Sequence, residues 1–230
     1  DPPGAVALEL GSGNTVWRST SFRSSHTSPL LITVDRESIV CIHGMFDLIG
    51  LQSKSGSVLF RHRLRDIAAD NVAFTPVWDF TRQQLIVSHG YCEIGTQAIG
   101  LVKESGAWKT TLNWSNRAMR LVYTNAVIAS ETLVGVTGNA GVFVGLSCRD
   151  GHTVFRTRGP KKSNLLRVDD SVLILEDRGL LRFGAISKDG YTERWKLDTA
   201  GQDSWTVPTW TDRGLLIRAE SSVRLFSFDD

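Results

Sequence analysis

GLQSKSGSVLFR, residues 50–61, contains no histidine, cysteine or acidic side chain, yet variants of it recur along the chain. In this stretch an apolar run reaches Gly50, and a polar stretch then closes in Ser55 and Gly56. A serine and a glycine at this position suit the positive φ of a tight turn between antiparallel strands. The segment that follows alternates in polarity and ends in Phe60, which favours a second strand. The stretch therefore predicts a β-hairpin that carries a large aromatic side chain.

Four other segments share this pattern of apolar run, polar turn with glycine, and closing aromatic residue. They are AVALELGSGNTVW (5–17), AIGLVKESGAW (98–108), FVGLSCRDGHTVF (143–155) and RFGAISKDGYTERW (182–195). In the copy at 98–108 the spacing from glycine to aromatic residue is irregular, and Trp114 is an alternative to Trp108 as the closing residue. The predicted hairpin-turn glycines are Gly13, Gly56, Gly106, Gly151 and Gly190, which stand 43, 50, 45 and 39 residues apart.

A period of about 44 residues is the size of one four-stranded propeller blade. A second landmark recurs out of phase with the first, because a proline or an asparagine precedes an apolar run in each unit. Proline is tolerated at the first residue of a strand, so these residues mark strand starts. They are Pro29, Pro76, Asn125, Asn164 and Pro208.

After each landmark strand, a second short apolar strand is predicted. These second strands are SIVCIHG, QLIVSHG, TLVGVTG, SVLILED and GLLIRAE. Each complete unit thus predicts a meander of four short strands, and no helical period occurs. We predict an all-β fold, a β-propeller of four-stranded antiparallel blades that spans residues 1–230 as one domain. The predicted repeat units are 1–19 (partial), 20–64, 65–116, 117–159, 160–198 and 199–230 (partial).

The closing aromatic residues are predicted to dock one blade on the next. An aromatic side chain at the end of the fourth strand offers a large apolar surface for packing between sheets. We therefore expect these side chains to be buried between adjacent sheets, and we expect the loss of one to cost about 3 to 5 kcal/mol. The predicted docking residues are Trp17, Phe60, Phe155 and Trp195.

Composition argues against two classes of partner. The chain has 26 basic and 24 acidic residues, and a net charge of +2 does not suggest a dedicated nucleic-acid surface. No apolar run approaches the roughly 18 residues that a membrane-spanning helix needs. Two local basic groups are interpreted either as binding patches or, as we favour, as solvated strand ends and loops. The groups are Arg23, Arg61, Arg63 and Arg65, and Arg158, Lys161 and Lys162.

The cysteines and histidines do not form a recognisable metal motif. Cys41, Cys92 and Cys148 lie in or beside apolar runs without a C-x-x-C pair, so we expect small buried packing residues. His43 and His89 both stand before a glycine at the end of a predicted second strand. Their repetition allows a shared binding surface, and the simpler interpretation is a pair of hydrogen-bonded turn residues.

Ala7, Glu9, Ser12, Gly13 and Trp17 fit the blade pattern Ala-x-Asp-x-x-Thr-Gly-x-x-x-Trp. On these residues the chain resembles the PQQ-like (pyrroloquinoline quinone repeat) β-propeller family, in which the tryptophan docks between blades. The stretches 48–60 and 143–155 fit the pattern more loosely. The last third of the chain resembles the propellers related to the bacterial outer-membrane protein assembly scaffold.

This resemblance implies a non-catalytic scaffold that presents loops and strand edges to protein partners, in the periplasm or cell envelope of a bacterium. The alternative is a quinone- or small-ligand-binding, dehydrogenase-like propeller, with its site in the central channel or in N-terminal blades absent from this chain. Enzymes of the family hold the quinone near a disulfide of adjacent cysteines, with calcium bound by Glu, Asn and Asp. No adjacent cysteines occur here, and none of those ligands can be placed on this sequence. We therefore predict no catalytic residues, no metal and no cofactor.

The ends of the predicted strand pattern bear on the number of blades. The chain opens within a third and a fourth strand and stops at a third strand, which leaves open edges that a closed ring would not have. A composite blade could close a ring of five blades, with the strand AVALEL as a surplus. Because relatives have seven or eight blades, we favour further blades on the N-terminal side.

Overall fold

The computed structural model describes residues 4–66, 72–90, 93–138, 141–199 and 203–227. Throughout these ranges the regular structure consists of strands, which form six antiparallel sheets joined by turns and loops. The chain forms two compact units, Asp1–Arg117 and Ala118–Asp230, with three sheets in each. The fold class predicted from the repeats, an all-β protein built from four-stranded antiparallel meanders, is confirmed.

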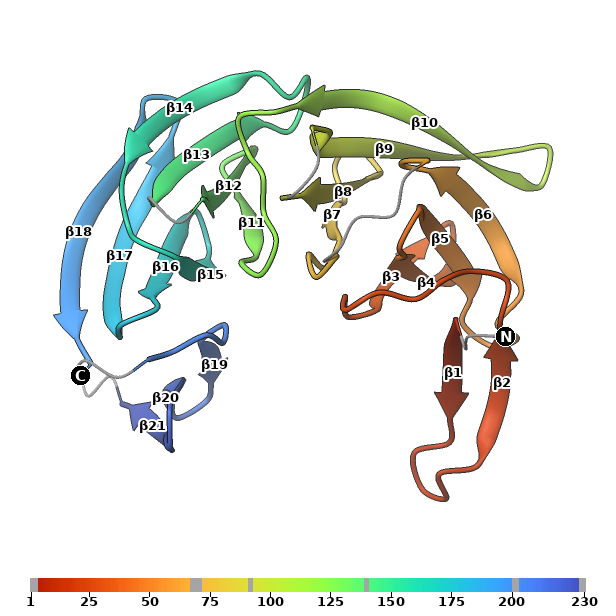
Figure 1. The fold of residues 1–230 in the computed structure, drawn as a ribbon, viewed down its shortest axis with the longest axis horizontal. Helices are drawn as coiled ribbons and strands as arrows, with labels where there is room; N and C mark the ends of the chain where they lie inside the picture. The colour runs from red at the N-terminus through yellow and green to blue at the C-terminus, as the bar shows by residue number, and fades with distance from the viewer. Residues whose placement is uncertain (1–3, 67–71, 91–92, 139–140, 200–202, 228–230) are drawn as a thin grey trace. The chain divides into compact units, whose positions relative to one another are not determined.

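The first unit begins with a two-stranded sheet of β1 (Ala5–Leu8) and β2 (Thr15–Ser19). The second sheet has the order β3 (Leu30–Val34), β4 (Glu37–His43), β5 (Asp47–Gln52) and β6 (Val58–Arg63). The third sheet has the order β7 (Val77–Asp79), β8 (Gln84–His89), β9 (Gly95–Glu104) and β10 (Ala107–Asn116). In each sheet, neighbours in sequence are neighbours in space, as Figure 1 shows.

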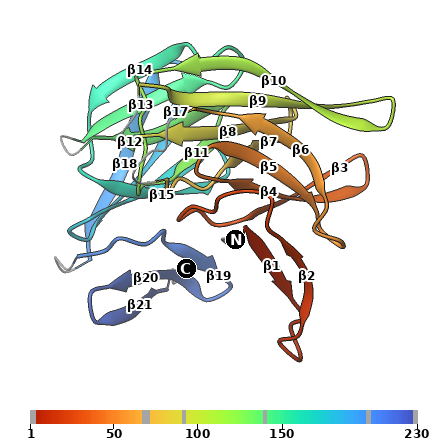
Figure 2. The ribbon, with the colours of Figure 1, turned by 45° about the vertical axis from the view of Figure 1, so that its right-hand side comes forward.

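The second unit repeats this meander. Its first sheet holds β11 (Ala126–Ala129), β12 (Thr132–Thr137), β13 (Val142–Ser147) and β14 (Thr153–Arg158). Its second sheet holds β15 (Ser163–Val168), β16 (Ser171–Glu176), β17 (Leu180–Ser187) and β18 (Gly190–Asp198). Its third sheet holds β19 (Thr209–Thr211), β20 (Gly214–Ala219) and β21 (Ser222–Phe226), and Figure 2 shows the sheets turned by 45° from Figure 1.

The proline and asparagine landmarks lie where the first strands begin. Pro29, Pro76 and Pro208 come directly before β3, β7 and β19, and so occupy positions that need no ladder N–H. Asn125 comes directly before β11 and ties two sheets together with its side chain. Its Nδ2 donates to the carbonyl oxygen of Leu165 at 2.7 Å, and its Oδ1 accepts from the Leu165 amide at 2.7 Å. The side-chain amide of Asn125 thus bonds the backbone of Leu165 in the way that a residue of a paired strand would, and it links β11 to β15.

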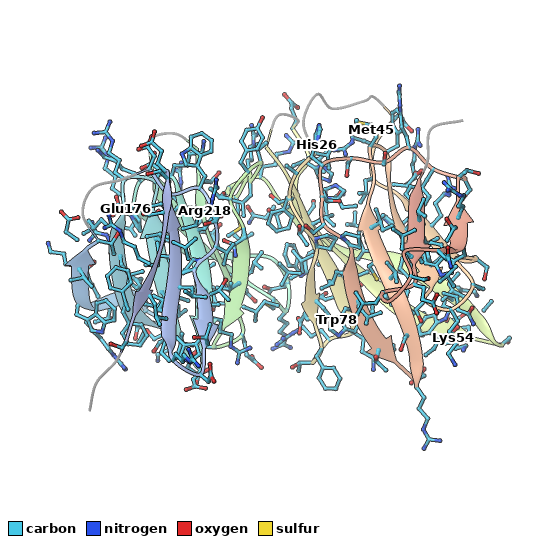
Figure 3. All side chains as sticks on the ribbon, turned by 90° about the horizontal axis from the view of Figure 1, so that it is seen from below. His26, Met45, Lys54, Trp78, Glu176 and Arg218 are labelled. Carbon is cyan, nitrogen blue, oxygen red and sulfur yellow. The ribbon has the colours of Figure 1, made fainter. Side chains whose placement is uncertain are left out.

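In each meander the first strand begins at the end where the second strand finishes, because the two strands are antiparallel. We call this the strand-start end of a sheet. In Figure 3, His26 before β3 and Met45 after β4 lie at this end of the first unit. Trp78 in β7 and Lys54 in the turn after β5 lie at the opposite end. The loops at the strand-start end include those that form the candidate site.

The core lies between neighbouring sheets of a unit. All six residues of β8 and all six of β16 are buried, and each strand has an apolar centre flanked by buried polar residues. One cluster joins the β3–β6 and β7–β10 sheets, for example through Ile39 and Leu85. Another joins the β11–β14 and β15–β18 sheets through Phe143 and Ile174. Among the described residues, no helix is long and apolar enough to span a membrane.

Candidate functional site

The predicted turn glycines all adopt positive φ: Gly13 +73°, Gly56 +71°, Gly106 +82°, Gly151 +73° and Gly190 +119°. At Gly56 the glycine also makes room for a neighbouring sheet, because a Cβ there would lie 2.4 Å from Cε3 of Trp17. The indole Nε1 of Trp17 donates to the carbonyl oxygen of Ser53 at 2.9 Å. Trp17, on β2, therefore packs on the β5–β6 turn of the next sheet.

Phe60 and Phe155 lie opposite a glycine in the neighbouring strand of their own sheets. Phe60 pairs with Gly50, and Phe155 pairs with Gly145. A Cβ on either glycine would lie within 2.2 Å of the ring, so each ring covers the glycine opposite it. Phe60 is buried, whereas Phe155 is partly buried and its Cβ approaches the position of a Cβ at Gly190 in the next sheet.

The prediction that Trp195 is buried between sheets is wrong. Trp195 is 38% exposed and stacks on Phe183 of its own sheet with ring centroids 5.4 Å apart. The strand residue opposite it is Phe183 rather than a glycine, which leaves no room for the indole to fold inward. Tyr191 instead covers Gly184 and meets the Phe143 ring of the neighbouring sheet at 5.3 Å.

In the irregular copy neither tryptophan takes the place of the closing aromatic residue. Gly100 occupies the repeat position of Ala7, but it pairs with Thr111, whereas Trp114 pairs with Ala98. A register shift between Leu112 and Trp114 accommodates the longer spacing. Trp108 is also buried, and its indole Nε1 donates to Glu37 Oε2 at 3.0 Å. The spacing in the sequence could not decide between the two tryptophans, and the structure buries both of them.

His43 and His89, at the ends of β4 and β8, come together in the first unit, but they do not face a surface. Both are buried, and their ring centroids are 4.6 Å apart in an edge-to-face arrangement. His43 Nδ1 lies 3.0 Å from the carbonyl oxygen of Phe74, so it carries the hydrogen and donates. The Arg65 guanidinium donates to His89 Nδ1, which fixes the opposite tautomer in that ring.

Burial lowers the pKa of His43 to about 3, and it lowers the pKa of His89 to about 2. The Arg65 charge contributes in the same direction for both rings, and that guanidinium is held by the carbonyl oxygens of Gly44 and Met45. The Nε2 atoms of both histidines are buried without a hydrogen-bond partner. Two neutral rings beside a fixed cation form a structural contact rather than an acid–base pair.

The other predicted groups are distributed among structural roles. Cys41 and Cys148 are buried free thiols, and burial raises the pKa of Cys41 to about 12. Cys92 lies outside the described residues. Arg61 and Arg63 both bind Asp47, each at 3.2 Å, so those two cations of the predicted basic group are paired.

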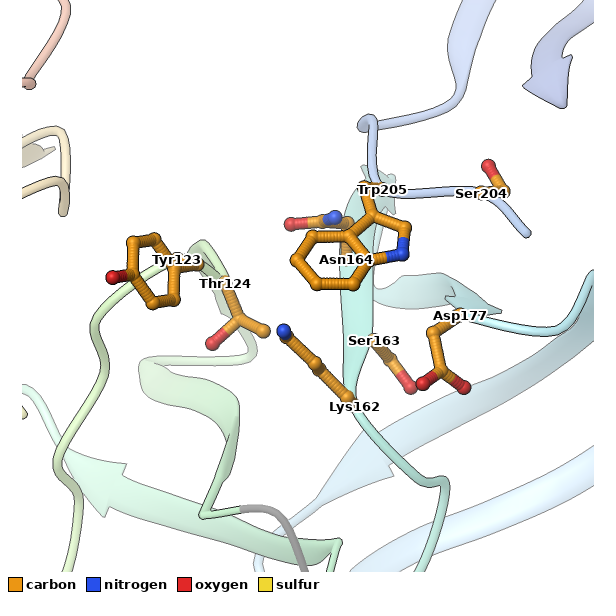
Figure 4. A pocket seen from close by; sticks show the side chains of 8 residues that line it. All are labelled: Tyr123, Thr124, Lys162, Ser163, Asn164, Asp177, Ser204 and Trp205. Carbon is orange, nitrogen blue, oxygen red and sulfur yellow. The ribbon is translucent and has the colours of Figure 1, made fainter. Parts of the chain in front are cut away.

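A pocket lies at the strand-start end of the second unit. Three loops contribute to it: one before β11, one before β15 and one before β19, with the residue after β16 completing the wall. The space that its residues outline, about 210 Å³, includes open solvent. We call it the Lys162 pocket, and Figure 4 labels its lining residues, which are Tyr123, Thr124, Lys162, Ser163, Asn164, Asp177, Ser204 and Trp205.

The Lys162 ammonium is held between two aromatic rings in this pocket. Its Nζ lies 3.5 Å from the centre of the Trp205 ring and 5.5 Å from the centre of the Tyr123 ring. Both rings are largely open to solvent, with Trp205 60% exposed and Tyr123 48% exposed. Figure 4 shows the lysine side chain directed toward the space between the two rings. The cation–π contacts fix the ammonium, and its N–H groups remain available.

Asp177 supplies the opposite charge in the same pocket. Its Oδ1 is buried without a hydrogen-bond partner. Its backbone anchors the walls, because the Asp177 amide donates to the Lys162 carbonyl and the Ser204 amide donates to the Asp177 carbonyl, each at 2.8 Å. The Ser204 hydroxyl is already used, donating to the carbonyl of Arg218. The pocket therefore offers one cation and one carboxylate oxygen, and no ion pair joins Lys162 to Asp177.

The described residues do not fit the quinone–calcium site of the family that the sequence resembles. Calcium takes 6 to 8 oxygen ligands in proteins, roughly, and several come from carboxylates. No group of three His, Cys, Asp or Glu side chains able to hold a metal ion occurs in the described part of the chain. We derive no chemical step through that cofactor.

Sequence analysis singled out Lys162 as part of a basic group but did not identify the pocket. Tyr123 and Trp205 are 82 positions apart in the chain, and no spacing rule joins them. The sequence does hold one indication that these residues are close, because Lys162 and Trp205 both precede a predicted strand start. That position places their loops at the same end of neighbouring sheets.

Comparison with known proteins supports the fold. No family model matches the chain, and no curated protein matches it. A proposed 6-phosphogluconolactonase from Bacteroides uniformis ATCC 8492 is similar in structure, with TM-score 0.61, 12% identity, and coverage of 98% of this chain and 73% of that one. Hsv2 from Kluyveromyces lactis gives TM-score 0.55 and 12% identity over 91% and 69% of the two chains.

BamB from Moraxella catarrhalis gives TM-score 0.49 and 13% identity over 93% of this chain and 75% of that one. The similarity to the first two structures, at these identities, establishes the fold alone. Together with the six antiparallel sheets, it shows that the chain has the fold of a β-propeller.

Proposed function

We propose that the chain is a non-catalytic β-propeller of the PQQ-like type that acts as a protein-interaction scaffold in the bacterial periplasm or cell envelope. The observation that carries the proposal is the pair of exposed aromatic side chains, Tyr123 and Trp205, on either side of Lys162. Aromatic residues are enriched in protein–protein interfaces, and tryptophan and tyrosine dominate interface hot spots. The family and the location rest on the sequence resemblance.

The size of the Lys162 pocket favours a protein partner over a cofactor. Pockets for small molecules and cofactors usually occupy about 300 to 1,000 Å³ and bury most of the ligand. The space of about 210 Å³ at the Lys162 pocket includes open solvent, so the enclosed part is smaller still. A quinone placed there would remain mostly exposed.

A thermal titration separates the scaffold from the quinone-binding alternative. The protein is melted alone, with calcium alone, and with pyrroloquinoline quinone plus calcium, while fluorescence of the tryptophans is followed. The scaffold proposal predicts the same melting temperature in all three samples. A rise of several degrees that saturates with quinone would show binding to the native state and would remove the scaffold-only proposal.

A further inference from the structure

We propose that the Lys162 pocket binds an acidic side chain of an extended segment in a partner protein. The inference rests on the proposed function, since it takes the partner to be a protein. It adds the chemistry that the partner presents, which is a carboxylate with a hydrogen-bond donor beside it. Two features of the pocket support it, the Lys162 ammonium held by two rings and the Asp177 Oδ1 without a hydrogen-bond partner.

Lys162 is prepared to receive an anion. Its ammonium lies 3.5 Å from the Trp205 ring centre and makes no hydrogen bond or ion pair with the other described residues. Elsewhere in the chain Lys103 and Lys109 bind Glu37 and Glu104. A lysine loses much side-chain freedom on binding, and the two rings have already restricted Lys162. Preorganisation of this kind reduces the entropic cost of an ion pair with a partner.

Asp177 determines which group of the partner can lie next to the bound carboxylate. Its Oδ1 is buried without a donor, and leaving such an atom unpaired is unfavourable. A partner that brings an N–H or O–H group to Asp177 would remove this cost once the carboxylate turns its covered Oδ1 toward the pocket. The backbone amide beside an aspartate or glutamate in an extended segment supplies such a donor. A phosphate dianion carries twice the charge of a carboxylate, so the Asp177 charge repels it more strongly.

The surroundings agree with an acidic segment. Lys161 and Arg178, in the loops beside the pocket, are exposed and add two positive charges near Lys162. One exposed negative charge, that of Asp203 next to Ser204, lies in the loop before β19 and offsets part of this positive charge. The exposed rings of Tyr123 and Trp205 can pack against the backbone of the bound segment.

A peptide selection tests the proposal without a known partner. A library of random decapeptides displayed on phage is selected on the immobilised protein at low salt. The same library is selected on Lys162→Met, Lys162→Arg, Lys161→Met and Trp205→Ala. Lys161→Met is the matched control, because it removes an adjacent exposed lysine that does not line the pocket. Synthetic peptides from the enriched pool are then titrated by fluorescence anisotropy, with and without inorganic phosphate.

We expect enriched peptides that share an aspartate or glutamate. Their affinity should fall about tenfold or more in Lys162→Met, a typical effect of truncating one partner of an interfacial charge pair. Lys161→Met should change the affinity less than threefold, Lys162→Arg should retain most of it, and phosphate should not compete. Conversion of the shared acidic residue to its amide should weaken binding to the wild type but not to Lys162→Met, because the pair is already broken.

Three results would overturn the inference. They are an enriched pool without a shared acidic residue, equal losses in Lys161→Met and Lys162→Met, and displacement of the peptides by phosphate. Neutral peptides whose binding still depends on Trp205 would remove the inference and leave the scaffold function standing. A pool with no binding peptides would also contradict the inference. The scaffold function would then be tested separately, by photocrosslinking from position 205 to partner proteins in cells.

Discussion

The contact between Trp17 and Gly56 joins two neighbouring sheets, and a substitution at Gly56 measures how much this contact contributes to the stability of the protein. Gly56 has φ +71°, a conformation that costs an alanine about 1 to 2 kcal/mol. In addition, a Cβ at this position would lie 2.4 Å from Cε3 and 2.6 Å from Cδ2 of Trp17. The ring cannot move away without straining its hydrogen bond to Ser53, and overpacking of this kind costs about 1 to 3 kcal/mol. Gly56→Ala should therefore destabilise the protein by about 2 to 5 kcal/mol.

Gly106→Ala is the matched control. Gly106 has φ +82°, but no atom lies within 4 Å of the position that a Cβ would take. It should lose only the conformational contribution of about 1 to 2 kcal/mol. The free energies of unfolding are compared by urea denaturation, followed by circular dichroism. In a chain of this length, each kcal/mol should also lower the melting temperature by about 2 to 4 °C.

The Trp17→Ala background isolates the contact between the sheets. With the ring removed, Gly56→Ala should cost no more than Gly106→Ala, because the steric contribution disappears. Equal costs for the two glycine substitutions in the wild-type background would refute the packing argument. So would a Gly56→Ala cost that is unchanged when Trp17 is absent.

Other predictions concern buried groups. The pKa values of His43 and His89 are lowered from about 6.5 to about 3 and about 2, so the unfolded chain takes up protons first as pH falls. Stability should be full above about pH 6.5 and fall below it by about 1 kcal/mol per pH unit for each histidine. The urea midpoint should drop from pH 7 to pH 5, and less so in His43→Asn; an equal drop would contradict this. Trp195→Ala should cost about 1 kcal/mol and Phe60→Ala about 3 to 5 kcal/mol, since Trp195 is half open and Phe60 is buried; similar melting temperatures for the two variants would argue otherwise. Cys41, with its buried thiol, should react with iodoacetamide at pH 8 only after unfolding, and rapid labelling of the native protein at this residue would oppose its placement.

The repeating hairpin could be predicted from sequence because its causes are local. A turn such as Ser55–Gly56 needs a residue that tolerates positive φ, and the alternating segment after it suits a strand. The proline landmarks succeeded for the same reason, since the missing N–H restricts where Pro29 and Pro76 can lie in a sheet.

The packing of Trp195 could not be predicted from the motif because it depends on the residue across the strand pair. In three copies the closing aromatic residue follows the turn glycine by four positions, whereas Trp195 follows Gly190 by five. That additional residue moves the indole opposite Phe183 and gives the inward position to Tyr191. The spacing was visible in the sequence, but its consequence required the register.

The candidate site depends on contacts between loops that are distant in sequence. Lys162 alone suggests a solvated loop, and Tyr123 or Trp205 alone suggests an ordinary surface aromatic residue. Their association follows from the propeller meander, which brings the loops before successive first strands to one end of the sheets. His43 and His89 occupy the same position in consecutive repeats, which the sequence shows, but the contact between their rings follows from the packing of the sheets.

Site-specific crosslinking tests the proposed scaffold function most directly. A photoreactive benzoyl-phenylalanine replaces Trp205 in one variant and Phe80 in another, and both are irradiated in bacterial cells that produce the protein. Phe80 is a suitable control because it is also exposed, at 76%, and lies outside the Lys162 pocket. The proposal predicts a discrete protein adduct from position 205 that is weak or absent from position 80. Identical adduct patterns from the two positions, or no adduct from position 205, would contradict it.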